Sequence, residues 1–533
     1  MNNIVKDLQY LVSGEVSSRP EMLAEFSQDF GNVFRKEPQV VVRPHSVDDV
    51  VKTVRYAHQQ GLILSPRATG HSLSGQSLSQ NGIVLDMRSL NQIHKIHKDA
   101  LYFKADAGVS WGQVVNACTP DGLVPPVLTN YFNATLGGTH AAAGMGASSF
   151  RNGTQASNCL GLEVVTAEGE IVWCSPEENS ELFHHVLCGF GQFGIITQVQ
   201  HKLRRYLPLT RTYLVFYDDL DALLRDKQTL VLEKRVDHLV SLPIPCVQGV
   251  SRATGIMQPL IQWFYTLQIT VEMSTDDAVD DREVLAGLNF YRHIHTENLD
   301  FEQFITPTIQ VETATNLAHP WTDVFLPAST AKNYIETALQ KLTSFLDVSR
   351  TPMGCFCLVN RDNRTPMFAL PDEELVIGFG IYPTIPRSQL QPVLAELSKL
   401  SDLSFEMGGK RYLTGLVNFE AQQWQRQFGD YWPTIHEMKK KYDPQGVLNP
   451  GFFQKEWIAE PLISQEPQTI PQTISEDLTS EFPIQTQLLE EAASKPMVGA
   501  ATSTKLSSLQ AIALAMLALL FLLFFNGSLV GSA

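Results

Sequence analysis

The sequence is poor in cysteine and in basic residues, and both shortages exclude classes of protein. Seven cysteines occur in 533 residues, and their odd number and spacing fit neither a disulfide framework nor a zinc site. We interpret them as buried thiols of a reducing compartment. Lysine and arginine total 40 against 56 acidic residues, and the net charge of −16 argues against nucleic acid as a partner.

Metal ligands and a secretory leader are also lacking. His94 and His97, and the adjacent His184 and His185, have no third ligand at a suitable spacing, so we interpret them as surface histidines and predict no metal site. The first fourteen residues lack the basic segment and continuous apolar run of a signal peptide. We therefore expect the catalytic part of the chain to lie in the cytoplasm.

The C-terminal end has a different composition. Lys505 is the last charged residue, and residues 511–525 are apolar without interruption. Neutral flanks extend this run toward the length that spans a bilayer, so we predict a single-pass transmembrane tail anchor at 506–530, with a buried core helix as the alternative. Residues 456–505 are rich in Pro, Gln, Glu, Ser and Thr, which predicts a disordered linker between the anchor and the catalytic body.

Residues 67–76 (RATGHSLSGQ) place a histidine in a turn that is rich in Gly, Ser and Thr. The flanking periodicity predicts a strand, an amphipathic helix ended by Gly61, a buried strand and a resumed sheet strand at residues 39–44, 47–60, 62–64 and 83–87. Backbone N–H groups of such a turn are free to face a pyrophosphate. His71 is therefore a candidate ring ligand, base or covalent attachment point, with an ordinary turn residue as the alternative.

Two further glycine-rich segments follow. Residues 135–146 (TLGGTHAAAGMG) contain many small side chains, which allow a backbone to approach a flat cofactor closely. Residues 189–194 (GFGQFG) match the dinucleotide fingerprint letter for letter. That fingerprint requires a strand before the glycines and a helix after them, whereas here a helix-like segment, 180–188, precedes them and a strand, 195–200, follows. Nicotinamide binding is therefore not inferred.

These motifs, in this order, resemble the flavoproteins of the vanillyl-alcohol oxidase type, which carry a PCMH-type FAD-binding domain, and are most similar to the cytokinin dehydrogenases. The match runs from residues 29–31 to 203 and returns at 410–413 and 442–451. The resemblance implies an α+β fold with a two-subdomain FAD-binding domain and an antiparallel-sheet substrate domain backed by helices. The implied divisions are FAD-binding residues 1–203, substrate-binding (cap) residues 204–407, a return to the FAD-binding domain over 408–455, the linker 456–505 and the tail 506–530.

Periodicity within the later part of the chain agrees with that division. Apolar alternation predicts strands, and helical spacing of apolar residues predicts helices. The predicted strands are 213–217 and 265–272, and the predicted helices are 219–232, 331–346 and 419–441. Cys355 and Cys357 would alternate normally on a strand. The segment 319–327 (HPWTDVFLP) also resembles the family, where it leads into the substrate-domain sheet.

The resemblance implies FAD as the cofactor and assigns its contacts. His71 falls where the family's histidine is joined covalently to the flavin ring. The other implied contacts are Ala68, Thr69, Gly70, Ser72, Gln76, Thr135, Ala141, Met145, Ile195, Tyr412 and Asn449. Ala141 and Asn449 stand where a serine is usual, and Phe452 stands where a glutamine is usual.

Asn130 is the most consequential departure from the family pattern. At this position the family carries a catalytic aspartate that hydrogen-bonds the substrate amine and stabilises the cation left as hydride passes to flavin N5. An amide has no charge and cannot act as a general base, a role typically worth about 10²–10⁴ in rate. His140, Glu312 and Asp323 are the other candidates for supplying that group.

Three functions follow from these observations. The leading hypothesis is an FAD-dependent, cytokinin dehydrogenase-like oxidoreductase that transfers hydride from a C–H next to nitrogen, in a small N6-substituted adenine, to flavin N5. The alternative is an FAD-dependent alcohol or carbohydrate oxidase, which fits the loss of the carboxylate at Asn130. The third is a catalytically inactive flavin-binding membrane protein. Oxygen or a quinone would be the electron acceptor, and a membrane tether suits a quinone.

Overall fold

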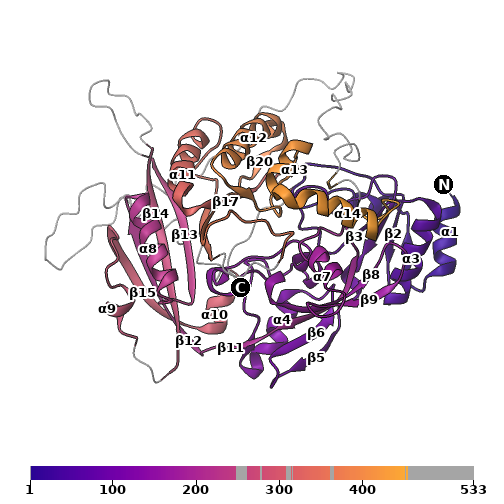
Figure 1. Ribbon diagram of the computed structural model, residues 1–533, viewed down its shortest axis with the longest axis horizontal. Coiled ribbons are helices and arrows are strands. Elements are labelled where there is room, and N and C mark those ends of the chain that lie inside the picture. Colours follow the sequence, from indigo (N-terminus) through magenta and orange to yellow (C-terminus); the bar gives the residue numbers. More distant parts are fainter. Residues whose placement is uncertain are drawn as a thin grey trace, which may run out of the picture. The chain divides into compact units, whose positions relative to one another are not determined.

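The computed structural model describes residues 2–247, 261–275, 279–307, 314, 316–359, 365–449 and 452–453. Over these residues the chain has a mixed α/β fold built on three larger sheets (Figure 1). The predicted linker 456–505, the predicted tail 506–530 and Glu312 lie outside the described residues. No helix within those ranges has both the length and the apolarity needed to cross a bilayer.

The first sheet contains the strand that leads into the histidine turn. Its strands, in sheet order, are β1 (Glu15–Ser17), β2 (Val40–Arg43), β4 (Ile83–Asp86) and β3 (Leu64–Arg67). Strands β2 and β3 run parallel to β4. Helix α3 (Val47–Gln60) has the predicted bounds: Ser46 caps its first turn, and Gly61 ends it with φ of +62°. The prediction of a strand at 62–64 has the wrong bounds. The Leu62 N–H still bonds the Ala57 carbonyl of α3, and strand pairing starts at Leu64.

The second sheet is antiparallel. Its strands, in sheet order, are β5 (Ile93–His97), β6 (Tyr102–Asp106), β10 (Ile195–Lys202), β8 (Cys159–Val165) and β9 (Ile171–Cys174). Helix α7 (Ser180–Val186) precedes the glycines 189–194 and β10 follows them, so their order is opposite to that of a nucleotide-binding turn. The interpretation of His185 as a surface histidine is wrong: the side chain is buried and its ring hydrogen-bonds Glu181 and Tyr431.

The third sheet, which we call the cap sheet, is antiparallel throughout and carries most of the later strands. In sheet order it contains β15 (Arg292–Asp300), β12 (Leu209–Tyr217), β14 (Ile261–Met273), β13 (His238–Val247), β18 (Met353–Val359), β19 (Leu375–Ile381), β17 (Thr322–Pro327) and β21 (Lys410–Arg411). Helices α8 (Leu220–Leu232), α11 (Ala328–Leu342) and α12 (Leu390–Glu406) contact the sheet, and α11 packs against both α8 and α12 (Figure 1). The predicted antiparallel sheet backed by helices is therefore present.

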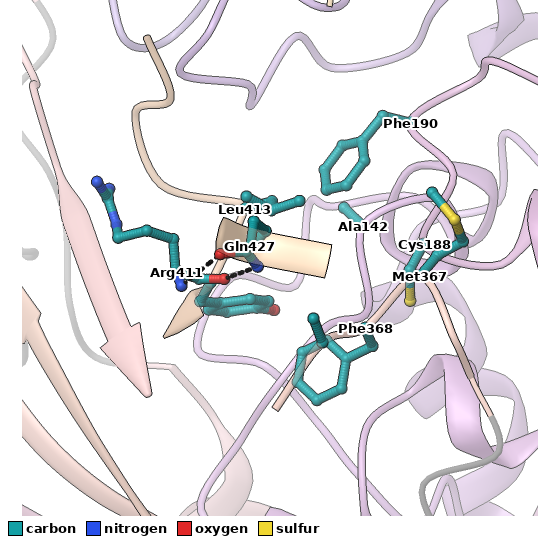
Figure 2. Close-up of a pocket in the computed structure, with 10 residues that line it drawn as sticks. Ala142, Cys188, Phe190, Met367, Phe368, Arg411, Leu413 and Gln427 are labelled. Carbon is teal, nitrogen blue, oxygen red and sulfur yellow. Dashed lines mark hydrogen bonds between the residues drawn. The ribbon is translucent and has the colours of Figure 1, made fainter. Parts of the chain in front are cut away.

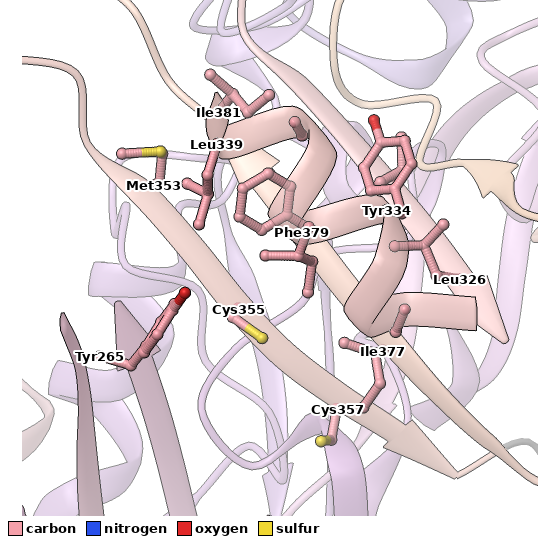
Figure 3. Close-up of a cluster of buried hydrophobic side chains, with 14 of the residues drawn as sticks. Tyr265, Leu326, Tyr334, Leu339, Met353, Cys355, Cys357, Ile377, Phe379 and Ile381 are labelled. Atoms are coloured by element: carbon pink, nitrogen blue, oxygen red, sulfur yellow. The ribbon is translucent and has the colours of Figure 1, made fainter. Parts of the chain in front are cut away.

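The helix-covered face of the cap sheet forms the largest apolar core. Tyr334 and Leu339 of α11 lie over Phe379 of β19 (Figure 3). Cys355 and Cys357 of β18 point into the same core, as the predicted alternation requires. Burial of such side chains supplies the main stabilisation of this layer, at about 25 cal/mol per Å² of apolar surface.

The segment after α12 departs from its predicted single helix. Residues 419–441 form two helices, α13 (Ala421–Phe428) and α14 (Trp432–Tyr442), separated by a 3₁₀ turn. Gly429 ends the first helix with φ of +56°, and Pro433, in the first turn of the second helix, has no N–H to continue the ladder. Residues beyond α14 return to the first sheet, where the Leu64 N–H bonds the Val447 carbonyl at 2.8 Å.

Candidate functional site

The histidine turn after β3 presents a row of backbone N–H groups that have no acceptor in the described part of the chain. Gly70 has φ of +69°, and a Cβ added there would lie 2.4 Å from the Arg67 guanidinium. No described residue accepts a hydrogen bond from the N–H groups of residues 69–73. Successive N–H donors in such a turn form a concave site for an anion such as a pyrophosphate.

Two buried side chains of opposite charge that sequence reasoning missed support this turn. Asp29 accepts hydrogen bonds from the Ser72 hydroxyl at 2.8 Å and from the Gly75 N–H at 2.9 Å. Lys36 donates to the Gly75 carbonyl at 3.2 Å. Burial raises the pKa of Asp29 to about 6 and lowers that of Lys36 to about 8. Nothing in the sequence positions of Asp29 and Lys36 indicates that both side chains bind the loop that contains Gly75.

Replacing Asp29 by alanine is expected to destabilise the protein and loosen its flavin. The change leaves the Gly75 N–H without its acceptor and Lys36 buried without its counter-charge, and an unsatisfied buried donor alone costs about 1–3 kcal/mol. Thermal unfolding and the flavin released on gel filtration measure both effects. Asp99→Ala, at an exposed position, is the matched control. Unfolding and flavin retention equal to those of the control would show that the pair does not hold the turn.

Phe30, Tyr131 and Trp321 lie around the His71 ring and form what we call the aromatic enclosure, although the residue itself keeps exposed surface. The ring stacks on Tyr131 at 4.1 Å between ring centroids and lies 4.3 Å from Phe30 and 6.3 Å from Trp321. His71 itself remains solvent-exposed, yet desolvation by these neighbours lowers its pKa to about 4, and His319 acts in the same direction. The ring is therefore neutral near pH 7 and keeps a nitrogen lone pair for a covalent bond.

Asn130 lies beside this enclosure. It precedes Tyr131, whose ring stacks on His71, and it is exposed. No described residue hydrogen-bonds its amide. The position is therefore close to the histidine turn, as the sequence predicts, but the side chain supplies no charge there.

The second predicted group of contacts surrounds a short helix, α5 (Leu136–His140). Thr135 is its buried N-cap, and Ala141 ends it. The chain then turns through Ala143, at an unfavourable φ of +91°, and Gly144, at +69°, to Met145. A Cβ at Gly144 would lie 2.1 Å from the buried Gln155 Oε1. This turn places backbone where a side chain would not fit.

Two further predicted contacts are Ile195, the first residue of β10, and Asn449, which bonds the first residue of β3. Ile195 is fully buried in the core of the first sheet. Asn449 has φ of +44°, donates to the Phe190 carbonyl at 2.8 Å, and its N–H bonds the Leu64 carbonyl at 3.0 Å. Phe452 stacks on Phe190 at 4.6 Å, so it contributes packing where the family carries an amide.

Tyr412 joins the cap sheet to the glycine-rich turn. Burial raises the pKa of its phenol, which interacts with Thr414 and with the Gly144 backbone. Figure 2 shows a small cavity beside it, between Ala142, Cys188 and Phe368, with a volume of about 10 Å³. That volume is close to the minimum for one water. Arg411 and Gln427 close this region through two mutual hydrogen bonds of 2.8 and 2.9 Å.

His140 and Asp323, the two described candidates for replacing the family's aspartate, differ in where they lie and in what they bond. His140 is fully buried, and both ring nitrogens are engaged, with the Leu136 carbonyl at 2.7 Å and with His201 at 3.0 Å. It belongs to the core of the second sheet rather than to the site. Asp323, on β17, accepts a hydrogen bond from the Tyr382 hydroxyl at 2.7 Å, and Trp321 connects this pair to the enclosure around His71.

The residues present fit FAD. The row of free N–H groups suits a pyrophosphate, and the turns at Gly70 and Gly144 let the backbone approach a flat ring. The buried Gln155 Oε1 has no hydrogen-bond partner among the described residues and lies at the Gly144 turn. A neutral His71 completes a set that can bind an anion, pack an aromatic ring and form one covalent bond.

Comparisons with known proteins agree with this geometry. A family model described as FAD binding domain matches residues 38–175, and one described as cytokinin dehydrogenase 1, FAD and cytokinin binding, matches residues 210–454. Cytokinin dehydrogenase 4 of Oryza sativa subsp. japonica is 32% identical over 467 residues, which cover 80% of this chain and 87% of that protein. An uncharacterized oxidoreductase of the fasciation locus of Rhodococcoides fascians is 30% identical over 439 residues, covering 81% and 96%.

A solved structure shows the same fold. The chain superposes on 6-hydroxy-D-nicotine oxidase of Arthrobacter nicotinovorans with a TM-score of 0.63 at 21% sequence identity. The superposition covers 82% of this chain and 96% of that one. The mixed α/β fold is therefore shared with that oxidase.

Proposed function

Because the chain belongs to the cytokinin dehydrogenase family of FAD-dependent oxidoreductases, we propose that it oxidises a C–H next to nitrogen in an N6-substituted adenine. The observation that carries the proposal is the aromatic enclosure formed by Phe30, Tyr131 and Trp321 around His71. It offers flat apolar faces next to the histidine turn, which suit a planar heterocycle. FAD, when bound, accepts the hydride at N5.

We also propose that His71 holds the flavin covalently. Support comes from the position of His71 in the turn with free N–H groups and from its low pKa, which leaves the ring neutral. A neutral nitrogen can form a bond to the flavin ring, whereas a protonated one cannot. The family's histidine stands at the same place in the turn.

The acceptor and the membrane tether belong to the same proposal. A C-terminal anchor at 506–530 with a cytoplasmic catalytic domain would bring the flavin near membrane quinones, with oxygen as the other acceptor. Support comes from the uninterrupted apolar run 511–525 alone. Partition of the full chain between membranes and an alkaline wash tests the anchor, and reoxidation by a soluble quinone compared with oxygen tests the acceptor.

Anaerobic mixing of the purified full chain with N6-isopentenyladenine tests the substrate. Rapid bleaching of the flavin's visible absorbance is expected, because hydride transfer from the substrate reduces the flavin. A protein that remains yellow contradicts the proposal. The same cuvette then serves for alcohols and sugars, whose oxidation is the second candidate function because Asn130 carries no charge to pair with an amine.

Asn130→Asp separates the two candidate functions. If the substrate is an adenine-type amine and no other residue supplies the base, the added carboxylate is expected to raise the rate of flavin reduction by that amine, by up to about 10²-fold. Asn133→Asp, three residues further along the same exposed segment, is the matched control. A gain in neither variant, together with reduction by an alcohol, favours the oxidase alternative.

A further inference from the structure

Asp323 lies on the face of the cap sheet that meets the FAD-binding domain, which we call the inner face. Side chains alternate along a strand, so Asp323 shares its side of β17 with Phe325. Phe325 packs against Tyr412, at 5.3 Å between ring centroids, within the core of the second sheet. Val324 and Leu326 point the other way, into the helix-covered core. The carboxylate is thus directed away from the helices.

Tyr382 and a glycine fix the carboxylate. The Tyr382 hydroxyl donates to Asp323 Oδ1 at 2.7 Å. Gly380 pairs directly with Asp323 across the sheet, and a Cβ there would lie 2.0 Å from the tyrosine oxygen and 2.4 Å from Asp323 Oδ1. Only glycine leaves room for this hydrogen bond. Asp323 Oδ2 accepts no hydrogen bond from any residue that the structure describes, so one oxygen is held and the other is left without a donor there.

The pair lies a short distance from the histidine turn. Trp321 packs edge-on to Tyr382 at 5.4 Å and to His71 at 6.3 Å. The Tyr412 N–H bonds the Asp323 carbonyl at 3.1 Å, which fixes the aspartate next to a predicted flavin contact. The Trp321 indole N–H is buried and has no partner among the described residues. An open acceptor and an unpaired donor therefore occur two residues apart beside the flavin turn.

The charges around Asp323 leave it able to take up a proton. Burial raises its pKa to about 6, and the Tyr382 hydrogen bond and the Arg411 charge oppose that shift. Arg411 donates to the Asp323 backbone carbonyl at 3.0 Å rather than to the carboxylate. Tyr412 also faces the group, and burial raises the pKa of its phenol. Asp323 is thus mainly ionised at pH 7, yet has no salt bridge within the described part of the chain.

We propose that Asp323, oriented by Tyr382, is the general base of this enzyme and performs the task that Asn130 cannot. The proposal rests on the proposed function. As the substrate C–H bond breaks, hydride passes to the flavin. The proton on the adjacent nitrogen passes to Asp323 Oδ2, and the C–N bond becomes C=N. The carboxylate is positioned by the cap sheet instead of by the segment that carries Asn130.

Asp323→Asn is the first test, with flavin reduction by N6-isopentenyladenine under anaerobic conditions as the readout. The rate constant of reduction at saturating substrate is expected to fall about 10²–10⁴-fold, with the flavin content unchanged. Asp226→Asn is the matched control. Asp226 is a buried carboxylate that accepts a hydrogen bond from Tyr217 at 2.8 Å, but it belongs to the helix-covered side of the sheet. Its amide variant is expected to reduce at the wild-type rate.

Tyr382→Phe tests the positioning role and guards against a fold defect in the first variant. The hydrogen bond lowers the pKa of Asp323, so its removal is expected to move the acidic limb of the rate profile to higher pH. In the wild type that limb is expected near pH 6, and in Asp323→Asn it is expected to vanish. A purely structural role for the pair would leave the position of the limb unchanged.

Stability and infrared spectra give readouts that do not need turnover. The folded pKa of Asp323 lies above its unfolded value of 3.8, so stability falls as the pH rises from about 4 to 6, and the full cost of ionisation is present above pH 6. Asp323→Asn is therefore expected to raise the melting temperature at pH 7–8, with the difference shrinking as the pH falls toward 4. A carboxyl band that titrates near pH 6 in difference infrared spectra is expected to be absent from this variant.

The results distinguish a wrong assignment of Asp323 as the base from a wrong assignment of the substrate. If adenine-type amines do not reduce the wild type but an alcohol does, the proposed substrate fails, and the same variants are tested with the alcohol, whose O–H proton replaces the N–H proton. Wild-type reduction rates and pH profile in Asp323→Asn, with the infrared band retained, would overturn the base assignment whichever substrate is used. A lowered melting temperature with no pH-dependent change would reassign Asp323 to structure.

Discussion

His71→Ala is expected to abolish the covalent flavin completely. In the wild type, flavin should remain with the protein through acid precipitation or denaturing electrophoresis, because a covalent bond survives unfolding. In the variant the denatured polypeptide should carry none. The native variant should still retain FAD by non-covalent contacts, since the free N–H groups of residues 69–73 and the turn at Gly70 belong to the backbone. In-gel flavin fluorescence measures the bond, and absorbance of the native protein measures total flavin.

The pH dependence of attachment follows from the pKa of the histidine. Desolvation lowers the pKa of His71 to about 4, so the ring is neutral from about pH 5 upward. Incorporation of added FAD into apoprotein is therefore expected to vary little between pH 5.5 and 8. His45→Ala, at an exposed position, serves as the histidine control. Covalent flavin in His71→Ala would move the attachment elsewhere, and its absence from the wild type would leave His71 as an aromatic contact only.

Gly146→Ala is expected to destabilise the folded protein strongly. A Cβ at Gly146 would lie 1.8 Å from the Leu128 carbonyl oxygen, well inside any tolerated contact. Both atoms are fixed to backbone, so neither can rotate away, and the segments that carry Asn130 and Met145 must separate. Such overpacking costs about 1–3 kcal/mol and sometimes more. The free energy of unfolding should fall by this amount, and FAD occupancy should fall with it.

The same substitution in a helix provides the control. Gly112 lies in α4 (Trp111–Cys118), and the atoms nearest to a Cβ there are 3.5 Å away, an ordinary contact. Alanine is favoured over glycine by about 0.5–1 kcal/mol in the middle of a helix, so Gly112→Ala, in the first turn of α4, should be neutral or stabilising. Denaturant unfolding of both variants measures the contrast. Equal stability of Gly146→Ala and wild type would mean that the 128 and 146 segments can separate freely.

Local physics made much of the FAD-binding half predictable from sequence. Helix α3 has its predicted bounds because apolar spacing, the Ser46 cap and the Gly61 stop all act within a few residues. The histidine turn was recognisable because glycine and small polar residues are needed for left-handed backbone and free N–H groups. The single helix predicted at 419–441 is wrong because Gly429, with φ of +56°, interrupts an otherwise helical pattern.

Long-range contacts decided the rest of the site. Asp29 and Lys36 precede the histidine turn by some forty positions, and no periodicity connects them to Ser72 or Gly75. His140 stood five residues from Thr135 in the cofactor segment, yet its ring points into the core and bonds His201. Buried polar groups must find partners wherever the fold brings them, and sequence separation does not reveal which partners those are.

By itself the sequence determined the family, its FAD cofactor and the uncharged residue at Asn130, because each is a matter of residue type at a local position. Only the tertiary structure decided where a replacement carboxylate lies. Strand alternation places Asp323 and Phe325 on one side of β17, but it does not say which side meets the flavin. The register of β17 against β19 sets Asp323 opposite Gly380 and within hydrogen-bond reach of Tyr382, 59 residues away. That pairing depends on the assembled sheet, and no local pattern encodes it.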